Sequence, residues 1–250
     1  METNNLDALG EKLVSCNLDC KGIRNSPQEG IIPRCLILEQ RRGKKKSIVV
    51  GLNPGKCKLL EKQFYLTNGI CYQSIKDHFE SKLKESPYFR KTRDLISLLE
   101  YDGDILWTEL AKCECSDKNG TLPIQTLRNC INEFLRKEIE LFDCKVIFAL
   151  GNKAFDFCAL SFPKHFVIGI PHPSGSYGHF NKLIEKIKEN KNSYIKELKN
   201  GYKKPIAIRI SEISDKKDYM GRRAKRAKKA DFRKILNKVP DRKPLFGDEL

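Results

Sequence analysis

Four short apolar runs divide the first two thirds of the chain, and each has the length of a buried strand. They cover residues 47–52, 104–110, 144–150 and 166–171. The stretches between them carry apolar residues at helical spacing instead, most clearly over residues 126–142. This alternation of strands and helices predicts an α/β fold, in which helices cover both faces of a central, mostly parallel sheet.

The predicted architecture is a three-layer α/β/α domain over residues 1–200, with four strands in its central sheet. Sheets of this kind bind ligands outside the carboxyl ends of their strands. Asn53, Glu109 and His172 each fall at the end of a different predicted strand. We therefore expect these three polar side chains to meet at one edge of the sheet.

Residues 201–250 have a different composition, in which positive charge dominates. The whole chain has a formal net charge of +16, which favours polyanions such as DNA as partners. We interpret the segment as a DNA-binding extension, and the alternatives are a solvated tail or an interaction segment for another partner. The residues expected to contact DNA phosphates are Arg222, Arg223, Lys225 and Arg226.

The sequence carries no pattern typical of a membrane protein. No apolar run approaches the roughly 20 residues that span a bilayer. Residues 1–5 are polar and show no signal-peptide pattern. We therefore expect a cytoplasmic protein that does not bind membranes, and we expect it to act as a monomer.

Two turns that follow predicted strands carry residues suited to catalysis. The first turn reads Gly51-Leu52-Asn53-Pro54-Gly55, where glycine and proline let a ligand approach the backbone and asparagine can hold a water molecule. The second turn reads His172-Pro173-Ser174-Gly175-Ser176, where a histidine can donate a hydrogen bond to developing negative charge. Taken alone, the first motif also fits an ordinary strand-to-helix turn, and the second also fits a buried core histidine.

Together, in this order and spacing, the two turns resemble the signature motifs of the uracil-DNA glycosylase superfamily. The first turn is similar to that of the mismatch-specific and single-strand-selective branches. The middle of the chain resembles the iron–sulfur branch, with Lys112-Cys113 after the second strand, Cys130 in the next helix and a strand that ends at Leu150-Gly151. The resemblance extends over residues 16–190.

The resemblance implies a DNA glycosylase, an enzyme that hydrolyses the bond between a base and its sugar. It implies that Asn53 positions the attacking water at C1′ and that His172 donates a hydrogen bond to the leaving base as negative charge develops. The reacting base must first leave the stack. The residues implied to bind the DNA backbone around it are Pro54, Gly55, Ser174, Gly175 and Ser176.

The resemblance also implies a pocket for the extruded base. Its expected contacts are the Gly51 and Leu52 backbone and an aromatic platform, for which Phe64 or Tyr65 is the candidate. Core packing is the alternative for these two aromatic residues. The polar reader of the base is expected at Glu109, which stands where the iron–sulfur branch has a uracil-reading asparagine.

Glu109 departs from the family pattern in a way that bears on the substrate. An ionised carboxylate only accepts hydrogen bonds, so it suits an exocyclic amine such as cytosine N4 and is repelled by uracil O4. A protonated Glu109 can donate to uracil O4. Pairing with a lysine at the rim of the site is a further alternative. The hypotheses are therefore excision of uracil or of a modified cytosine, and the latter would suit a defence against phage.

Four of the ten cysteines resemble the ligands of the iron–sulfur branch. They are Cys16, Cys20, Cys113 and Cys130. The resemblance implies that they hold a [4Fe–4S] cluster which ties the N-terminal segment to the sheet. The spacing of Cys16 and Cys20 is one residue longer than the branch commonly has, and Cys35 or Cys115 could replace one ligand. Zinc, or no metal at all, is the alternative, and Cys144 and Cys158 are predicted to be core residues.

We predict a monofunctional enzyme, because no lysine stands at a recognised nucleophile position. The alternative from another class is a non-catalytic DNA-binding module on a glycosylase scaffold. A glycosylase acting on RNA or on free nucleosides is a second enzymatic alternative, and the basic extension disfavours free nucleosides.

Overall fold

The computed structural model describes residues 2–117, 122–174, 178–202 and 207–210. Contacts divide the chain into two units, Met1–Ile210 and Ser211–Leu250. The second unit lies outside the described residues. The candidate phosphate contacts Arg222, Arg223, Lys225 and Arg226 therefore lie outside them too. Of the predicted basic extension over residues 201–250, residues 201–202 and 207–210 are described, and they belong to the first unit.

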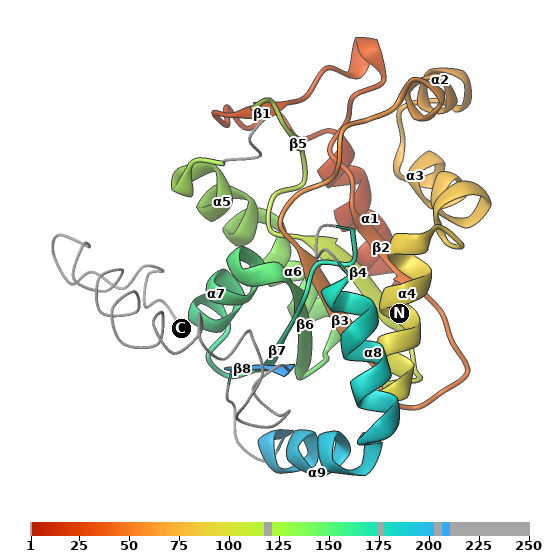
Figure 1. Cartoon of the computed structure of the whole chain (residues 1–250). Coiled ribbons are helices and arrows are strands. Elements are labelled where there is room, and N and C mark those ends of the chain that lie inside the picture. The colour runs from red at the N-terminus through yellow and green to blue at the C-terminus, as the bar shows by residue number, and fades with distance from the viewer. Residues whose placement is uncertain (1, 118–121, 175–177, 203–206, 211–250) are drawn as a thin grey trace, which may run out of the picture. The chain divides into compact units, whose positions relative to one another are not determined.

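A six-stranded sheet forms the centre of the first unit (Figure 1). Its strands follow the order β2-β4-β3-β6-β7-β8, and only the β2–β4 pair is antiparallel. The strands are β2 (Leu36–Glu39), β3 (Ser47–Gly51), β4 (Ile105–Glu109), β6 (Val146–Leu150), β7 (Phe166–Ile170) and β8 (Ala207–Arg209). The four predicted strands are confirmed as β4, β3, β6 and β7, which are adjacent and parallel.

The predicted number of four strands is wrong, because short strands extend the sheet at both edges. β2 lies in the polar segment before the first predicted strand, and β8 follows the last helix. Edge strands need few residues and gain part of their stability from pairing with a buried neighbour, so they leave a weak sequence pattern.

Helices cover both faces of the sheet, which gives the predicted three-layer α/β/α fold. α7 packs on β3, β6 and β7, whereas α4 and α8 lie together on the opposite side (Figure 1). Among the described helices, none is long and apolar enough to cross a membrane. The helices are α1 (Glu2–Val14), α2 (Leu59–Asn68), α3 (Tyr72–His78), α4 (Pro87–Leu98), α5 (Ile124–Cys130), α6 (Arg136–Phe142), α7 (Gly151–Ser161), α8 (His179–Glu189) and α9 (Lys191–Tyr202).

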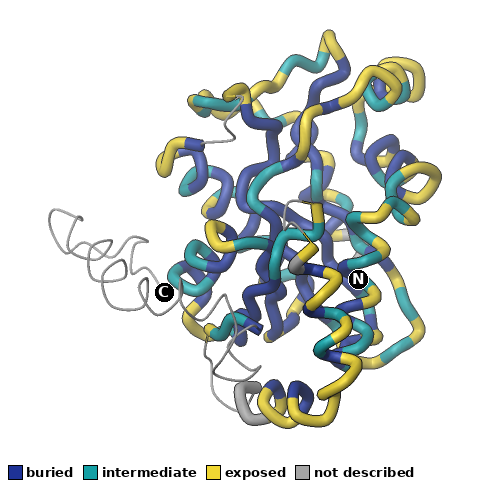
Figure 2. The backbone as a smooth tube through the Cα atoms, viewed as in Figure 1, coloured by how far each residue is buried: buried dark blue, intermediate teal, exposed yellow. Residues whose placement is uncertain are grey.

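The core lies in the four inner strands, where every residue is buried (Figure 2). Helices on both sides of a parallel sheet exclude water from both faces, which explains the continuous apolar runs in the sequence. Cys144 and Cys158 are buried beside this core, as predicted.

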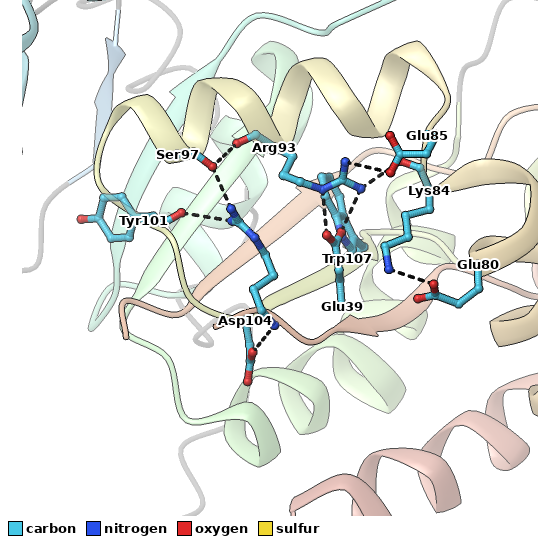
Figure 3. Close-up of polar contacts among 10 residues, drawn as sticks. Glu39, Glu80, Lys84, Glu85, Arg93, Ser97, Tyr101, Asp104 and Trp107 are labelled. Carbon is cyan, nitrogen blue, oxygen red and sulfur yellow. Dashed lines mark hydrogen bonds and ion pairs between the residues drawn. The ribbon is translucent and has the colours of Figure 1, made fainter. Parts of the chain in front are cut away.

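A buried ion pair joins the edge strand β2 to helix α4 (Figure 3). The guanidinium of Arg93 donates to both carboxylate oxygens of Glu39, at 2.7 and 3.2 Å. The indole N–H of Trp107 donates to the same carboxylate at 2.8 Å. Because three donors satisfy one buried charge, the pairing fixes α4 relative to β2 and β4.

We expect Glu39→Ala to destabilise the protein by about 3 kcal/mol, because Arg93 and Trp107 both lose their buried acceptor and Arg93 keeps only the exposed Glu85, at 3.6 Å, as an ionic partner. The matched control is Glu80→Ala, which removes an exposed i,i+4 pair with Lys84 and should cost at most about 1 kcal/mol. Urea denaturation followed by circular dichroism measures both changes. Equal losses in the two variants would contradict this assignment.

Candidate active site

The last residues of β3 and β4 form the floor of the candidate site. Gly51 and Glu109 are register partners in the parallel pair. The Glu109 carboxylate lies so close over Gly51 that a Cβ atom at residue 51 would collide with it. Beyond the strands, Leu110 donates to the Gly51 carbonyl at 2.9 Å and Ala111 donates to the Leu52 carbonyl at 3.0 Å. The predicted base-contacting backbone is thus fixed against the end of β4.

Asn53 is half-buried in the turn that follows β3, and one hydrogen bond fixes the orientation of its side-chain amide. Its Nδ2 donates to the Pro54 carbonyl at 2.9 Å. This hydrogen bond leaves Oδ1 as the group that can accept a hydrogen bond from a water molecule. Pro54 is buried, while Gly55 is exposed and has open space where a side chain would be.

The buried side chain of Arg34 anchors this turn by a hydrogen bond. Arg34 donates from Nη2 to the Gly55 carbonyl at 2.5 Å and pairs with Glu61 at 3.0 Å. Its guanidinium also lies 3.7 Å from the carboxylate of Glu114, which accepts a hydrogen bond from the Cys57 backbone at 2.5 Å. The C-terminal end of the turn is therefore tied to two buried charged groups, Arg34 and Glu114. The sequence analysis did not identify Arg34, because a lone arginine in a polar segment has no distinguishing pattern.

His172 follows β7, and its hydrogen bonding defines the ring tautomer. Nδ1 accepts from the Ser174 backbone N–H at 3.3 Å and lies 3.0 Å from the Ser174 hydroxyl. An accepting Nδ1 places the proton of a neutral ring on Nε2, which is then a donor. Burial lowers the pKa of His172, so the ring is neutral at pH 7. The arrangement suits donation of a hydrogen bond without a net charge on the ring.

Glu109 is buried, and its Oε2 has no hydrogen-bond partner among the described residues. Burial raises the pKa of Glu109 to about 8, although the charges of Lys112 and Arg34 act in the opposite direction. Lys112 itself pairs with Glu138 at 2.7 Å, so it is not a rim lysine that neutralises Glu109. An unpartnered buried carboxyl is costly in a folded protein, and a ligand that supplied its hydrogen bonds would remove that cost.

An aromatic cavity of about 60 Å³ adjoins Glu109. Its wall includes Tyr88, Phe89 and Trp107. The ring of Tyr88 also contacts His172, with 5.6 Å between the ring centroids. Tyr88 therefore joins the cavity to the histidine turn, and it is a candidate site residue that the sequence analysis missed. It lies at the start of α4, and only the packing of that helix brings it here.

Phe64 and Tyr65 take different positions from Tyr88. Both pack against His78, with centroid separations of 5.0 and 5.4 Å. Tyr65 is almost fully buried, and its ring forms part of the cavity wall on the Arg34 side. Phe64 is half-buried, and Tyr88, rather than either of these rings, is the aromatic side chain that contacts His172.

Four cysteines predicted as metal ligands come from three segments that converge beside β4. Thr126 in α5 donates to the Lys21 carbonyl at 2.7 Å, which fixes the N-terminal segment against that helix. Charges on the thiols of Cys16, Cys20 and Cys130 raise the pKa of Cys113, after burial as the largest cause. Burial is also the largest cause that raises the pKa of Cys130, to about 11. The Cys113 thiol is therefore near enough to the other three cysteines for their charge to affect its pKa.

The donor set of this cysteine group suits soft metals, because thiolates bind iron–sulfur clusters and zinc. Within the described part of the chain, no three His, Cys, Asp or Glu side chains are grouped as they would be around a single metal ion. Two other cysteines are possible replacement ligands. Cys35 lines the cavity beside Glu109. Cys115 lies in the short strand β5 (Glu114–Cys115), which pairs with β1 (Ile23–Arg24).

The remaining candidate DNA contacts lie in the histidine turn. Ser174 is exposed, in addition to its contact with His172. Gly175 and Ser176 lie outside the described residues. The predicted meeting of Asn53, Glu109 and His172 rests on the strand order, which places β4, β3, β6 and β7 side by side and parallel.

Comparison with known proteins identifies the family of the segment that carries the candidate site. The family model described as the Uracil DNA glycosylase superfamily matches residues 41–199, which include the asparagine turn, Glu109 and His172. A search of curated protein sequences found no match. The matched segment is more than half of the 250-residue chain and contains the whole parallel core of the sheet. The chain therefore belongs to the uracil DNA glycosylase superfamily.

Proposed function

We propose that this protein is a monofunctional DNA glycosylase that hydrolyses the N-glycosidic bond of a base flipped out of DNA. The observation that carries the proposal is the convergence of the asparagine turn, Glu109 and the neutral His172 on one edge of the sheet, within a superfamily that acts on DNA. The net charge of +16 supports a polyanionic substrate.

The two turns supply the chemistry. Asn53 would hold a water molecule through Oδ1 beside C1′ of the sugar, since its Nδ2 is already engaged by Pro54. The C1′–N bond breaks, the water oxygen bonds to C1′, and the proton released by the water ends on the departing base. His172 would donate from Nε2 to the base oxygen on which negative charge develops, and its lowered pKa disfavours protonation of the ring, so the proton is left to the departing base.

Glu109 would read the base from the cavity side. A protonated carboxyl both donates and accepts, so it complements uracil O4 and N3–H. It equally complements the amine and N3 of a cytosine derivative, and an ionised carboxylate still accepts from the amine. We propose uracil or an amino-bearing modified cytosine as the base, and the protonation state of Glu109 separates the two.

We further propose that the cysteine group holds a [4Fe–4S] cluster, with Cys16, Cys20, Cys113 and Cys130 as ligands. The resemblance to the iron–sulfur branch supports this assignment, and the Asn129 amide, next to Cys130 in α5, donates to the Cys20 sulfur at 3.8 Å. The cluster would supply cross-linking of the N-terminal segment to α5 and the end of β4, and no catalytic step passes through it.

Replacing Asn53 or His172 should greatly slow base excision and should leave the affinity for DNA unchanged. We expect Asn53→Ala and His172→Ala each to lower the single-turnover rate by about 100-fold or more, because each removes an interaction needed at the transition state. Asn190→Ala is the matched control, since this exposed asparagine makes a similar side-chain-to-backbone hydrogen bond far from the site. Full activity in both site variants would show that the assignment is wrong.

The pH dependence should distinguish the two classes of base. Glu109 with a pKa of about 8 is protonated below that pH and ionised above it. Uracil excision should therefore decline as the pH rises through about 8, because the donor to O4 is lost. Excision of a 5-hydroxymethylcytosine should decline less, because its amine still has an acceptor.

Glu109→Gln is the control for this titration. The amide is close in shape and keeps one donor and one acceptor at every pH, so the decline near pH 8 should disappear. A decline that persists in Glu109→Gln would assign the titration to another group. The panel should pair uracil with modified cytosines in otherwise identical oligonucleotides.

The proposed cluster predicts a visible absorbance band near about 400 nm in protein purified without oxygen. Cys130→Ser should lose most of the band, because a serine hydroxyl replaces one thiolate ligand. Cys71→Ser is the control, since Cys71 is half-buried and contacts Ser74 rather than the other thiols. An unaltered band in Cys130→Ser, or iron below the level of one cluster per chain, would contradict the assignment.

A further inference from the structure

A cavity of about 1090 Å³ lies at the edge of the sheet opposite the candidate active site. The segments that precede β3, β4 and β6 line it, and these three strands are parallel neighbours. Helix α9 supplies the remaining wall, and Figure 1 shows this helix beyond the starts of the strands. The groups of the candidate active site follow the ends of the strands instead, so the two sites share no lining residue.

Positive charge dominates the lining of this cavity. Within the described part of the chain, the lining includes six lysines and two carboxylates. One of the carboxylates, Glu100, is already engaged, because Lys45 donates to it at 3.2 Å and Lys199 lies 3.9 Å from it. The hydrogen bond from Lys45 and the surrounding lysine charges lower the pKa of Glu100. The lysines of the lining are Lys44, Lys45, Lys46, Lys145, Lys196 and Lys199.

Three of these lysines are available to a ligand. Lys44, Lys145 and Lys196 are exposed, and none of them pairs with a carboxylate among the described residues. They come from three separate segments, namely the residues before β3, the residues before β6 and helix α9. The fold therefore gathers cations from distant parts of the sequence around one cavity.

Backbone contacts fix the lysine run over residues 44–46. Gly103 donates to the Lys45 carbonyl at 3.0 Å. A Cβ atom at Gly43 would collide with Asp102, so the start of the run packs directly against the turn before β4. Cations on a fixed backbone lose less conformational freedom when they bind a ligand than cations on a flexible segment do.

The inner wall of the cavity is apolar. The ring of Tyr101 packs edge-on against Phe148, with 5.1 Å between the ring centroids, which fixes its position. An apolar wall beside several cations suits a ligand that has both a flat apolar body and several negative charges. The buried apolar residues of the wall are Leu99, Tyr101, Val146, Ile195 and Leu198.

Charge and volume together favour a small phosphorylated ligand. Sites for small molecules typically have volumes of about 300–1,000 Å³, and this cavity is of that order. A DNA duplex is too broad to enter it and could only lie across its rim. Lysine binds phosphate as a compact point charge. Among the described lining residues there is no arginine, and Glu100 is engaged by lysines, so we expect little selection among bases.

We propose that this cavity binds a nucleoside polyphosphate, with its phosphates among Lys44, Lys145 and Lys196 and its base against the apolar wall. Affinity should then depend on the number of phosphates more than on the identity of the base. The inference does not depend on the proposed glycosylase activity, because it concerns the opposite edge of the sheet and is tested by binding alone.

Calorimetric titration of the full-length protein with ATP, GTP, AMP, adenosine and inorganic triphosphate tests the ligand class. ATP and GTP should bind with similar affinity, and ATP should bind at least about tenfold more tightly than AMP, because fewer phosphates meet the lysines. Adenosine should not bind measurably. Inorganic triphosphate should bind at least about tenfold more weakly than ATP, because it lacks the base that contacts the apolar wall.

A pair of double variants locates the site. Lys145→Ala with Lys196→Ala should weaken ATP binding at least about tenfold, and both side chains are exposed, so the fold should persist in circular dichroism. Lys21→Ala with Lys82→Ala removes the same charge from two exposed lysines outside the cavity and should leave the affinity unchanged.

Three outcomes would overturn the proposal. Equal ATP affinity in the two double variants would place the nucleotide elsewhere. Inorganic triphosphate binding as tightly as ATP would show that the apolar wall contacts no base. No ATP binding by the wild-type protein, together with weaker binding of an undamaged duplex in the Lys145→Ala, Lys196→Ala variant, would assign these lysines to the DNA backbone instead.

Discussion

The parallel pairing of β3 with β4 is the constraint on which the candidate site depends. It places Gly51 opposite Glu109, and the ladder continues through the carbonyls of Gly51 and Leu52 beyond the strand ends. Because these hydrogen bonds lie inside a sheet that is buried on both faces, the asparagine turn and the carboxyl group cannot shift independently. A one-residue slip of either strand would reverse every side chain between the two faces and dismantle the core together with the site.

Buried charge extends this constraint outward to the surface. The Arg34 network joins the N-terminal segment, the asparagine turn and α2, and the Glu39–Arg93 pair joins β2 to the helix that carries Tyr88. A buried ion pair adds little to the net stability of a protein, but breaking it is costly. Each pair therefore favours a single arrangement of the two segments that it connects. Catalysis that relies on oriented groups benefits from that rigidity, because a misplaced donor stabilises the transition state poorly.

The sequence predicted the strands whose positions depend on local runs of apolar residues. Buried parallel strands appear as continuous apolar runs, so β3, β4, β6 and β7 were predicted with nearly correct ends. The rule that ligands bind at carboxyl strand ends then selected Asn53, Glu109 and His172 without a structure. The family match covers residues 41–199, a range that includes these three positions.

What the sequence did not predict depends on contacts between distant segments. β2 and β8 are strands because they pair with a neighbour, and their own sequences are short. Tyr88 reaches His172 only because α4 is fixed by Arg93, and Arg34 is buried only because two carboxylates receive it. The state of Glu109 likewise depends on its surroundings, since the same side chain in water would be ionised at pH 7.

The absence of a side chain at residue 51 limits the order in which residues 51 and 109 can change during evolution. The Glu109 carboxyl occupies the space that a Cβ at residue 51 would need. A substitution that adds a side chain at residue 51 is therefore tolerated only after residue 109 has become shorter or has turned away, while the reverse order is open at every step. Positions 51 and 109 are therefore expected to change together: the glycine must be kept for as long as a long side chain at 109 lies over it, and changes at this end of the sheet arise first at 109.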